Sequence, residues 1–68
     1  MGKSCHSREV IRLLESRGFI LRSVKGSHHK YVKDGWITIV PHPKKDLKFG
    51  TLKSILELAG LTFEDLED

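Results

Sequence analysis

The chain has 68 residues, which is enough for one small domain whose core is too small to enclose a dinucleotide or a ligand of similar size. Twelve lysines and arginines against nine aspartates and glutamates give a net charge of +3. Four of the acidic residues fall in the last five positions, so residues 1–63 hold twelve basic and five acidic side chains, a net +7, and we expect them to attract polyanions.

Cysteine content and hydropathy exclude several classes of protein. A single cysteine, Cys5, cannot form an intrachain disulfide, and no paired Cys or Cys/His pattern of a zinc site surrounds it. No apolar run approaches the roughly 18–20 residues that span a bilayer, and the N-terminus lacks a signal-peptide hydrophobic region. We therefore expect a cytoplasmic protein with no membrane role, in which Cys5 lies in a frayed N-terminus without a function.

The first two predicted elements are a helix and a strand. The helix runs from about Ser7, a favourable N-cap, to Arg17, and Gly18 is expected to end it. Residues 19–24, FILRSV, mix β-branched and aromatic side chains, which predicts a short strand ending at Gly26. The helix has apolar side chains at helical spacing: Val10, Ile11, Leu13 and Leu14.

A β-hairpin is predicted over residues 31–40. Two β-rich runs are separated there by Asp34 and Gly35, and this dipeptide favours a type I′ turn, which needs positive φ at both central positions. Pro41 and Pro43 are expected to end the third strand because proline has no amide to donate to the sheet. Residues 44–48 then form a basic loop.

Helical spacing returns after this loop. A second helix is predicted from Thr51 to Ala59, with Gly60 in position for a left-handed cap. Residues 62–68 form an acidic tail in which Thr62 and Asp65 match a capping box, and this tail either adds one short helical turn or frays. The apolar side of the helix comprises Leu52, Ile55, Leu56 and Ala59.

The order of elements predicts an α+β fold, α-β-β-β-α, as a single domain over residues 1–68. A three-stranded antiparallel sheet would bury one face under two helices and leave the other face to solvent. Double-stranded-RNA-binding domains use this arrangement, although fold alone does not decide function.

The hairpin register separates two adjacent histidines, His28 and His29. With a two-residue loop, alternation places His29 on the face that carries the large aromatic rings, and we assign that face to the core. His28 and Lys30 are then expected on the open face. The predicted core face comprises His29, Tyr31, Lys33, Trp36, Thr38 and Val40, and the open face comprises His28, Lys30, Val32, Ile37 and Ile39.

An open-face histidine amid positive charge suits chemistry on RNA. The two histidines point in opposite directions and no carboxylate within residues 25–31 offers a third ligand, so we predict no metal site. A histidine that removes the proton of a 2′-hydroxyl would let RNA attack its own phosphate. Lys30, or one of Lys44, Lys45 and Lys48, would neutralise the charge that builds on phosphorus.

Three segments carry a resemblance to a known family. They are SREVIRLLESRGF at the start, GSHHKY in the middle and VPHPKKDLKFGTLKSILELAGLT at the end. In their order and spacing the chain resembles the HicA-type toxins of bacterial and archaeal toxin–antitoxin pairs. The resemblance implies a double-stranded-RNA-binding-like fold and an mRNA endonuclease that uses neither metal nor cofactor. It also implies that cleavage arrests translation until a HicB-type antitoxin covers the toxin.

The same resemblance implies roles for individual residues. The catalytic histidine of the family's glycine-serine-histidine step corresponds to His28. Some relatives place this histidine one residue later, which keeps His29 as an alternative. His42 matches a frequent family histidine that either orients the loop or donates a proton to the leaving group.

The remaining candidate residues would bind phosphate. Ser27 either binds a phosphate oxygen or satisfies a local backbone group. Lys44, Lys45 and Lys48 lead into the second helix, whose N-terminal amides favour a phosphate.

Two other hypotheses remain from the sequence. In one, the chain is a non-catalytic RNA-binding domain that reads RNA shape with the same basic surface. In the other, it is mainly half of a protein complex whose basic face is covered by an acidic partner.

Overall fold

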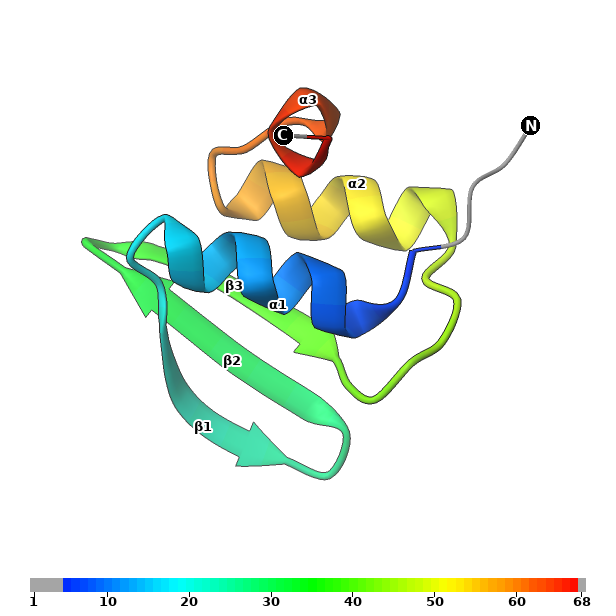
Figure 1. Cartoon of the computed structure of the whole chain (residues 1–68). Helices are drawn as coiled ribbons and strands as arrows, with labels where there is room; N and C mark the ends of the chain where they lie inside the picture. The colour runs from blue at the N-terminus through cyan, green and yellow to red at the C-terminus, as the bar shows by residue number, and fades with distance from the viewer. Residues whose placement is uncertain (1–4, 68) are drawn as a thin grey trace.

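The structure is a computed structural model and describes residues 5–67. It confirms the predicted α+β fold, a helix followed by three antiparallel strands and a second helix, with one short helix added at the end. The elements are α1 (Ser7–Ser16), β1 (Ile20–Lys25), β2 (His28–Lys33), β3 (Trp36–Pro41), α2 (Phe49–Leu58) and α3 (Phe63–Leu66) (Figure 1).

The sheet has the strand order β1-β2-β3, and each strand is joined to the next by a two-residue turn. In the β2–β3 turn, Asp34 has φ 44° and Gly35 has φ 89°, so the predicted type I′ geometry is confirmed. In the β1–β2 turn, the first central residue, Gly26, has φ 61°. The two tight turns set the register of β2 against both of its neighbours.

The predicted buried face of the sheet is confirmed at its centre. Tyr31, Thr38 and Val40 are buried, whereas Ile37 and Ile39 face solvent. The hydroxyl of Thr38 donates to the carbonyl of Ile55 in α2 at 2.9 Å, which satisfies the polar group inside the core. Together these contacts fix α2 over β3.

The expectation that Trp36 is buried was wrong. Its side chain is 49% exposed because it lies at the hairpin end of the sheet, beyond the centre of the core. One edge of the indole instead lies against Gly60, where a Cβ atom would come within 3.0 Å of the ring. Gly60 therefore serves both the left-handed end of α2, with φ 71°, and this close approach.

The start of α1 differs from the prediction. The N-cap is His6, whose Nδ1 accepts a hydrogen bond from the amide of Arg8 at 3.0 Å. Ser7 is the first helical residue and is fully buried, so its hydroxyl points into the protein instead of capping the helix. A histidine ring can accept from the second helical amide much as a serine oxygen does, which is why capping preference alone misplaced this boundary.

The prediction of a frayed N-terminus at Cys5 was also wrong. Cys5 is buried and its backbone forms an antiparallel bridge with Leu47, whose amide donates to the Cys5 carbonyl at 2.9 Å. Burial, reinforced by the nearby carboxylate of Glu9, raises the pKa of the Cys5 thiol. The bridge ties the chain just before α1 to the loop before α2.

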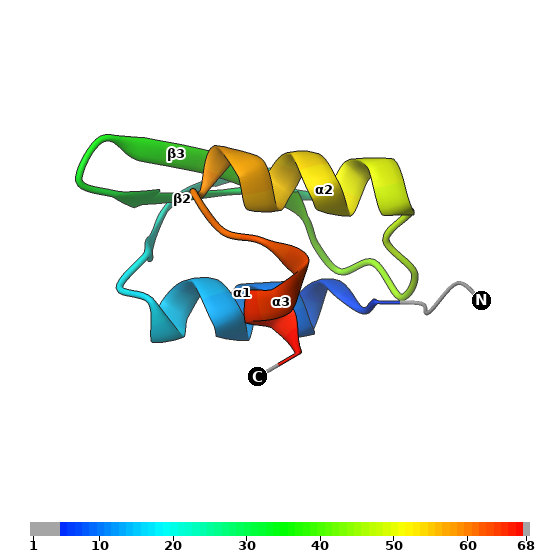
Figure 2. The same cartoon turned by 90° about the horizontal axis from the view of Figure 1, so that it is seen from above.

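Helix α2 begins two residues earlier than predicted, at Phe49. Its apolar side is buried as expected, and the amide of Leu61 donates to the carbonyl of Leu56 at 2.8 Å as the chain turns at Gly60. The N-terminal ends of α1 and α2 lie at the same end of the molecule (Figures 1 and 2).

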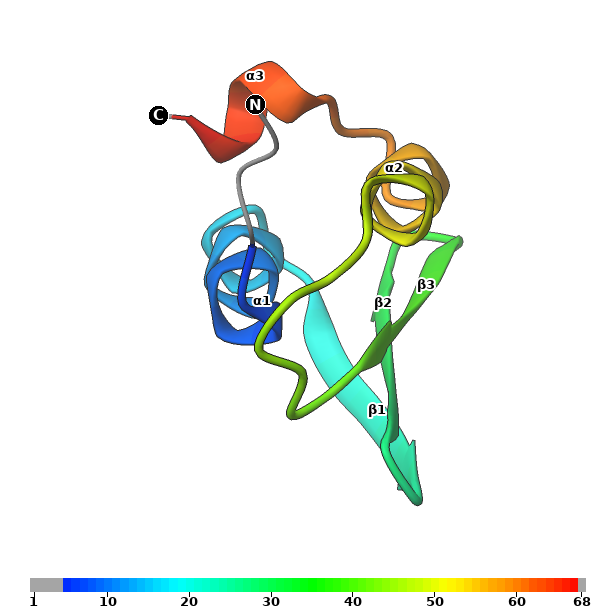
Figure 3. The same ribbon diagram turned by 90° about the vertical axis from the view of Figure 1, so that its right-hand side faces the viewer.

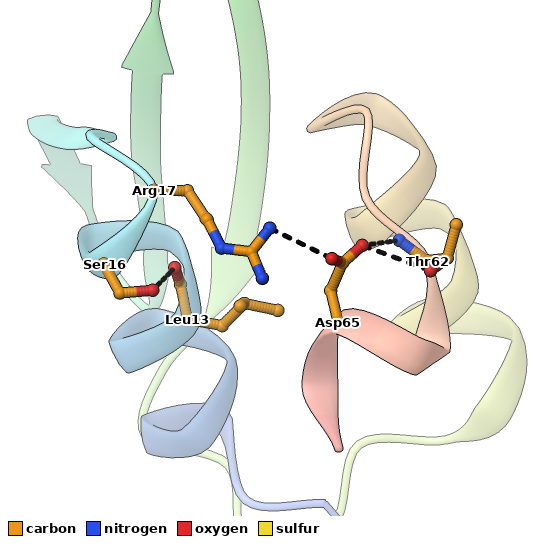
Figure 4. A network of polar contacts seen from close by, with 5 residues as sticks. All are labelled: Leu13, Ser16, Arg17, Thr62 and Asp65. Atoms are coloured by element: carbon orange, nitrogen blue, oxygen red, sulfur yellow. Dashed lines mark hydrogen bonds and ion pairs between the residues drawn. The ribbon is translucent and has the colours of Figure 1, made fainter. Parts of the chain in front are cut away.

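The segment after α2 adds the short helix α3, so the helical alternative holds for residues 63–66. Thr62 and Asp65 form the predicted capping box. The second oxygen of Asp65 accepts from the guanidinium of Arg17 at 3.0 Å, which connects α3 to the end of α1 (Figure 4). The hydrogen bond from the Thr62 backbone, together with Arg17, lowers the pKa of Asp65.

Strand β1 stands apart from the helices, and all six of its residues are exposed. Figure 3 shows it running away from α1 and α2. Between Leu21 and Ser23 the register shifts, so Arg22 is an extra residue that makes a β-bulge. The bulge leaves the alternation of β2 intact, because it lies in the neighbouring strand.

Two leucines of α2 test which face of the helix holds the core together. Leu56 is 1% exposed, so Leu56→Ala should lower the free energy of unfolding by about 2–5 kcal/mol, through lost burial and a new cavity. Leu58 is 56% exposed, and Leu58→Ala should change the stability by less than about 0.5 kcal/mol. Urea unfolding of both variants measures the difference, and equal losses would contradict this packing.

Candidate functional site

His28 lies at the start of β2 on the open face of the sheet, and it is exposed as predicted. Its cross-strand partner on β1 is Lys25. Lys30 is two residues further along β2, on the same face and partly buried. Two lysines therefore flank His28, one across the sheet and one along the strand.

His29 points to the opposite face, so the predicted separation of the two histidines is confirmed. Its backbone pairs with Val24 on β1 and with Val40 on β3, and the side chain is partly buried. The ring lies 5.0 Å from the ring of His42, between centroids, with the two planes nearly perpendicular. The structure thus brings His29 and His42 together and leaves His28 on the other side of the sheet.

His42 connects three segments of the chain. Its amide donates to the carbonyl of Ser27 in the β1–β2 turn at 2.7 Å, and its Nδ1 lies 2.6 Å from the hydroxyl of Ser7 at the start of α1. That hydroxyl also accepts from the amide of Lys44 at 2.9 Å, and the Ser7 amide donates to the Lys44 carbonyl at 2.8 Å. We call Ser7, His42 and Lys44 the serine–histidine clasp.

The surroundings of His42 disfavour its protonated form. Partial burial, followed by the positive charges that His29, His6 and Arg8 can carry, lowers the pKa of His42 below its ordinary value. The His6 ring lies 6.5 Å from that of His42. His42 is therefore held toward its neutral form at pH 7.

The phosphate-binding candidates outside the strands adjoin this clasp, Ser27 through its hydrogen bond with His42 and the loop lysines through the chain itself. Ser27 is exposed in the β1–β2 turn, and the structure uses its carbonyl to accept from His42. The loop lysines Lys44, Lys45 and Lys48 are exposed, and Lys48 is the N-cap of α2. Among residues 5–67, no three His, Cys, Asp or Glu side chains are grouped to hold a metal ion.

Sequence reasoning missed two residues of the site. Lys25 could have been found, because a two-residue turn at Gly26 and Ser27 places it directly opposite His28. Ser7 carried no such signal. Its partner His42 is 35 residues away, and only the folded loop brings the two side chains together.

The fold and the site together define a small α+β domain with an open sheet face on which a histidine stands between two lysines. A family model described as "HicA toxin of bacterial toxin-antitoxin" matches residues 7–61, which is most of the chain. The chain therefore belongs to the HicA toxin family, and its family role is that of a toxin in a toxin–antitoxin system. The comparison with curated proteins found no match.

The matched segment contains every predicted site residue, and it ends before α3. The ion pair between Arg17 and Asp65 thus joins the matched segment to a residue beyond it. Within residues 5–67, none of the helices has the length and apolar character needed to cross a membrane.

Two glycines give a matched test of the turn that presents His28. Gly26 has φ 61° with open space around it, so Gly26→Ala should cost about 1–2 kcal/mol through backbone strain alone. Gly50 lies in the first turn of α2, also in open space but without positive φ, so Gly50→Ala should stabilise the protein by up to about 1 kcal/mol. Thermal unfolding measures the stability of both variants. Stability changes of the same sign would contradict the turn geometry.

Proposed function

We propose that this HicA family toxin is a metal-independent endoribonuclease that cleaves mRNA and so arrests translation. The observation that carries the proposal is the exposed His28 on the open sheet face, flanked by Lys25 and Lys30. A titratable imidazole and fixed positive charge are what self-cleavage of an RNA phosphodiester requires.

In the proposed reaction, His28 takes the proton of a 2′-hydroxyl as general base. The 2′-oxygen then attacks the adjacent phosphorus, and the bond from phosphorus to the 5′-oxygen of the next nucleotide breaks. The products are a 2′,3′-cyclic phosphate and a 5′-hydroxyl, whose proton comes from the protonated base or from water. No metal or protein nucleophile takes part in these steps.

The surrounding side chains would hold the RNA backbone. Lys25 and Lys30 lie on the face of His28 and are placed to neutralise charge on the phosphorane. The exposed loop lysines and Ser27 extend the basic surface toward the start of α2, where they would bind neighbouring phosphates. His29 and His42, whose rings contact each other on the other side of the sheet, are supporting residues in this proposal and do not act as the general base.

The proposed partner of the free toxin is a HicB-type antitoxin. Family membership implies an antitoxin, and a net charge of +7 over residues 1–63 favours an acidic covering surface. Binding there would block RNA access to His28 and stop cleavage.

Removal of the imidazole tests the catalytic assignment. His28→Ala should lower RNA cleavage by about 10²–10⁴-fold, the usual contribution of a general acid or base, and leave folding nearly unchanged because the side chain is exposed. Ser23→Ala, an exposed change on the same face, is the matched control and should cleave like the native chain. Both are assayed with and without EDTA on a labelled transcript and on its 2′-O-methyl analogue.

Several outcomes would count against this function. Cleavage of the 2′-O-methyl analogue would exclude attack by the 2′-oxygen, and loss of cleavage in EDTA would exclude a metal-independent reaction. Growth arrest by both native protein and His28→Ala in cells would remove the catalytic role. Tight RNA binding by the native chain with no cleavage would favour the non-catalytic RNA-binding hypothesis.

The two lysines beside His28 predict a salt-dependent effect on RNA binding. Lys25→Gln and Lys30→Gln should each weaken binding to a single-stranded 2′-O-methyl RNA and reduce the slope of log affinity against log salt by about 0.7 per lost phosphate contact. Lys53→Gln, an exposed change on α2, should leave the slope unaltered. Fluorescence anisotropy between about 50 and 200 mM salt measures it, and equal slopes for all three variants would place the RNA elsewhere.

A further inference from the structure

The hydroxyl of Ser7 is an unusual group for the first turn of a helix, because the residue is fully buried. Its oxygen already accepts a hydrogen bond from the amide of Lys44. The proton of the hydroxyl therefore needs an acceptor inside the protein. Within the described residues, the group available to it is Nδ1 of His42 at 2.6 Å.

This arrangement determines where His42 carries its own proton. If Nδ1 accepts from Ser7, the neutral ring must hold its proton on Nε2. If Nδ1 were protonated, the Ser7 oxygen would face two donors, and among residues 5–67 its own proton would be left without a partner in a buried site. The clasp thus disfavours both the other tautomer and the imidazolium.

The charged neighbours of His42 act in the same direction. His29 faces it from β2, His6 from the segment before α1 and Arg8 from α1, and each of them opposes a positive charge on the ring. Lys44 contributes only its backbone groups to the bonds with Ser7. Among residues 5–67, the groups that shift the pKa of His42 include no carboxylate.

We propose that Ser7 is a positioning residue that locks His42 as a neutral ring with its proton on Nε2, which makes His42 an uncharged hydrogen-bond donor to an RNA phosphate oxygen. The part that concerns RNA rests on the ribonuclease function proposed above. A neutral imidazole that keeps its Nε2 proton is a poor acid, so proton transfer is left to His28. Of the two roles that the family resemblance implies for His42, the clasp thus supports orientation of the loop and argues against proton donation to the leaving group.

The lock itself is tested without RNA. In the native protein, ¹⁵N chemical shifts should report His42 with the proton on Nε2 and Nδ1 unprotonated, and the ring should titrate at lower pH than a free histidine. Ser7→Ala should produce a mixture of tautomers and move the His42 titration to higher pH. Ser16→Ala is the matched control on α1, since its exposed hydroxyl only donates to the Leu13 carbonyl at 2.7 Å, and it should change neither signal.

The ¹⁵N spectrum of the native protein tests the tautomer of His42 even if Ser7→Ala does not fold. A proton on Nδ1 of His42 in the native protein would overturn the lock, and so would a titration that Ser7→Ala leaves unchanged in a folded variant.

The role toward RNA needs two substitutions of His42. A glutamine amide can place an N–H group where Nε2 stood but cannot carry a proton through a reaction. His42→Gln should therefore retain cleavage within about tenfold of the native rate, whereas His42→Ala should lose clearly more. Equal loss in both variants, at unchanged folding, would overturn the donor role.

Failure of the ribonuclease hypothesis would look different. In that case the native chain itself would not cleave RNA, whereas the tautomer and titration of His42 would still support or overturn the lock.

Discussion

Two tight turns hold strand β2 in register with both of its neighbours, and most features of the site depend on that constraint. Because side chains alternate along a strand, adjacent histidines in β2 must face opposite sides of the sheet. His28 is thereby exposed between Lys25 and Lys30, and His29 is directed toward His42. A shift of one residue would exchange the two histidines and bury the basic face.

Local patterns were enough to predict most of the fold. Apolar spacing identified the helices, the Asp34-Gly35 turn identified the hairpin, and the aromatic rings on one of its faces identified the buried side of the sheet, because each signal lies within a few residues. The residues whose burial was predicted wrongly are those whose surroundings depend on distant parts of the structure. Ser7 and Cys5 are buried by residues 42–47, and Trp36 is exposed because the core ends before the hairpin does.

The candidate site also has one part that local patterns predict and another that they do not. The face of His28 followed from alternation, and its lysine partner could be derived from turn length. The serine–histidine clasp joins positions 7, 42 and 44, and nothing in the sequence pairs these residues. In the proposed function the two halves of the site serve different tasks: the exposed His28 transfers the proton on one face, and the His42 ring holds an RNA phosphate on the other. Under that proposal, catalysis and substrate placement are assigned to different faces of a domain too small for an enclosed cleft.

Strand β1 has a consequence for how the protein behaves at high concentration. An edge strand presents unpaired amides and carbonyls, and here it also exposes Ile20, Leu21 and Val24, so it resembles a template for unwanted sheet extension. The bulge at Arg22 breaks the regular spacing of those groups, and its charged side chain makes stacking of further strands unfavourable. The irregularity in β1 thus protects the chain against self-association into fibrils or aggregates.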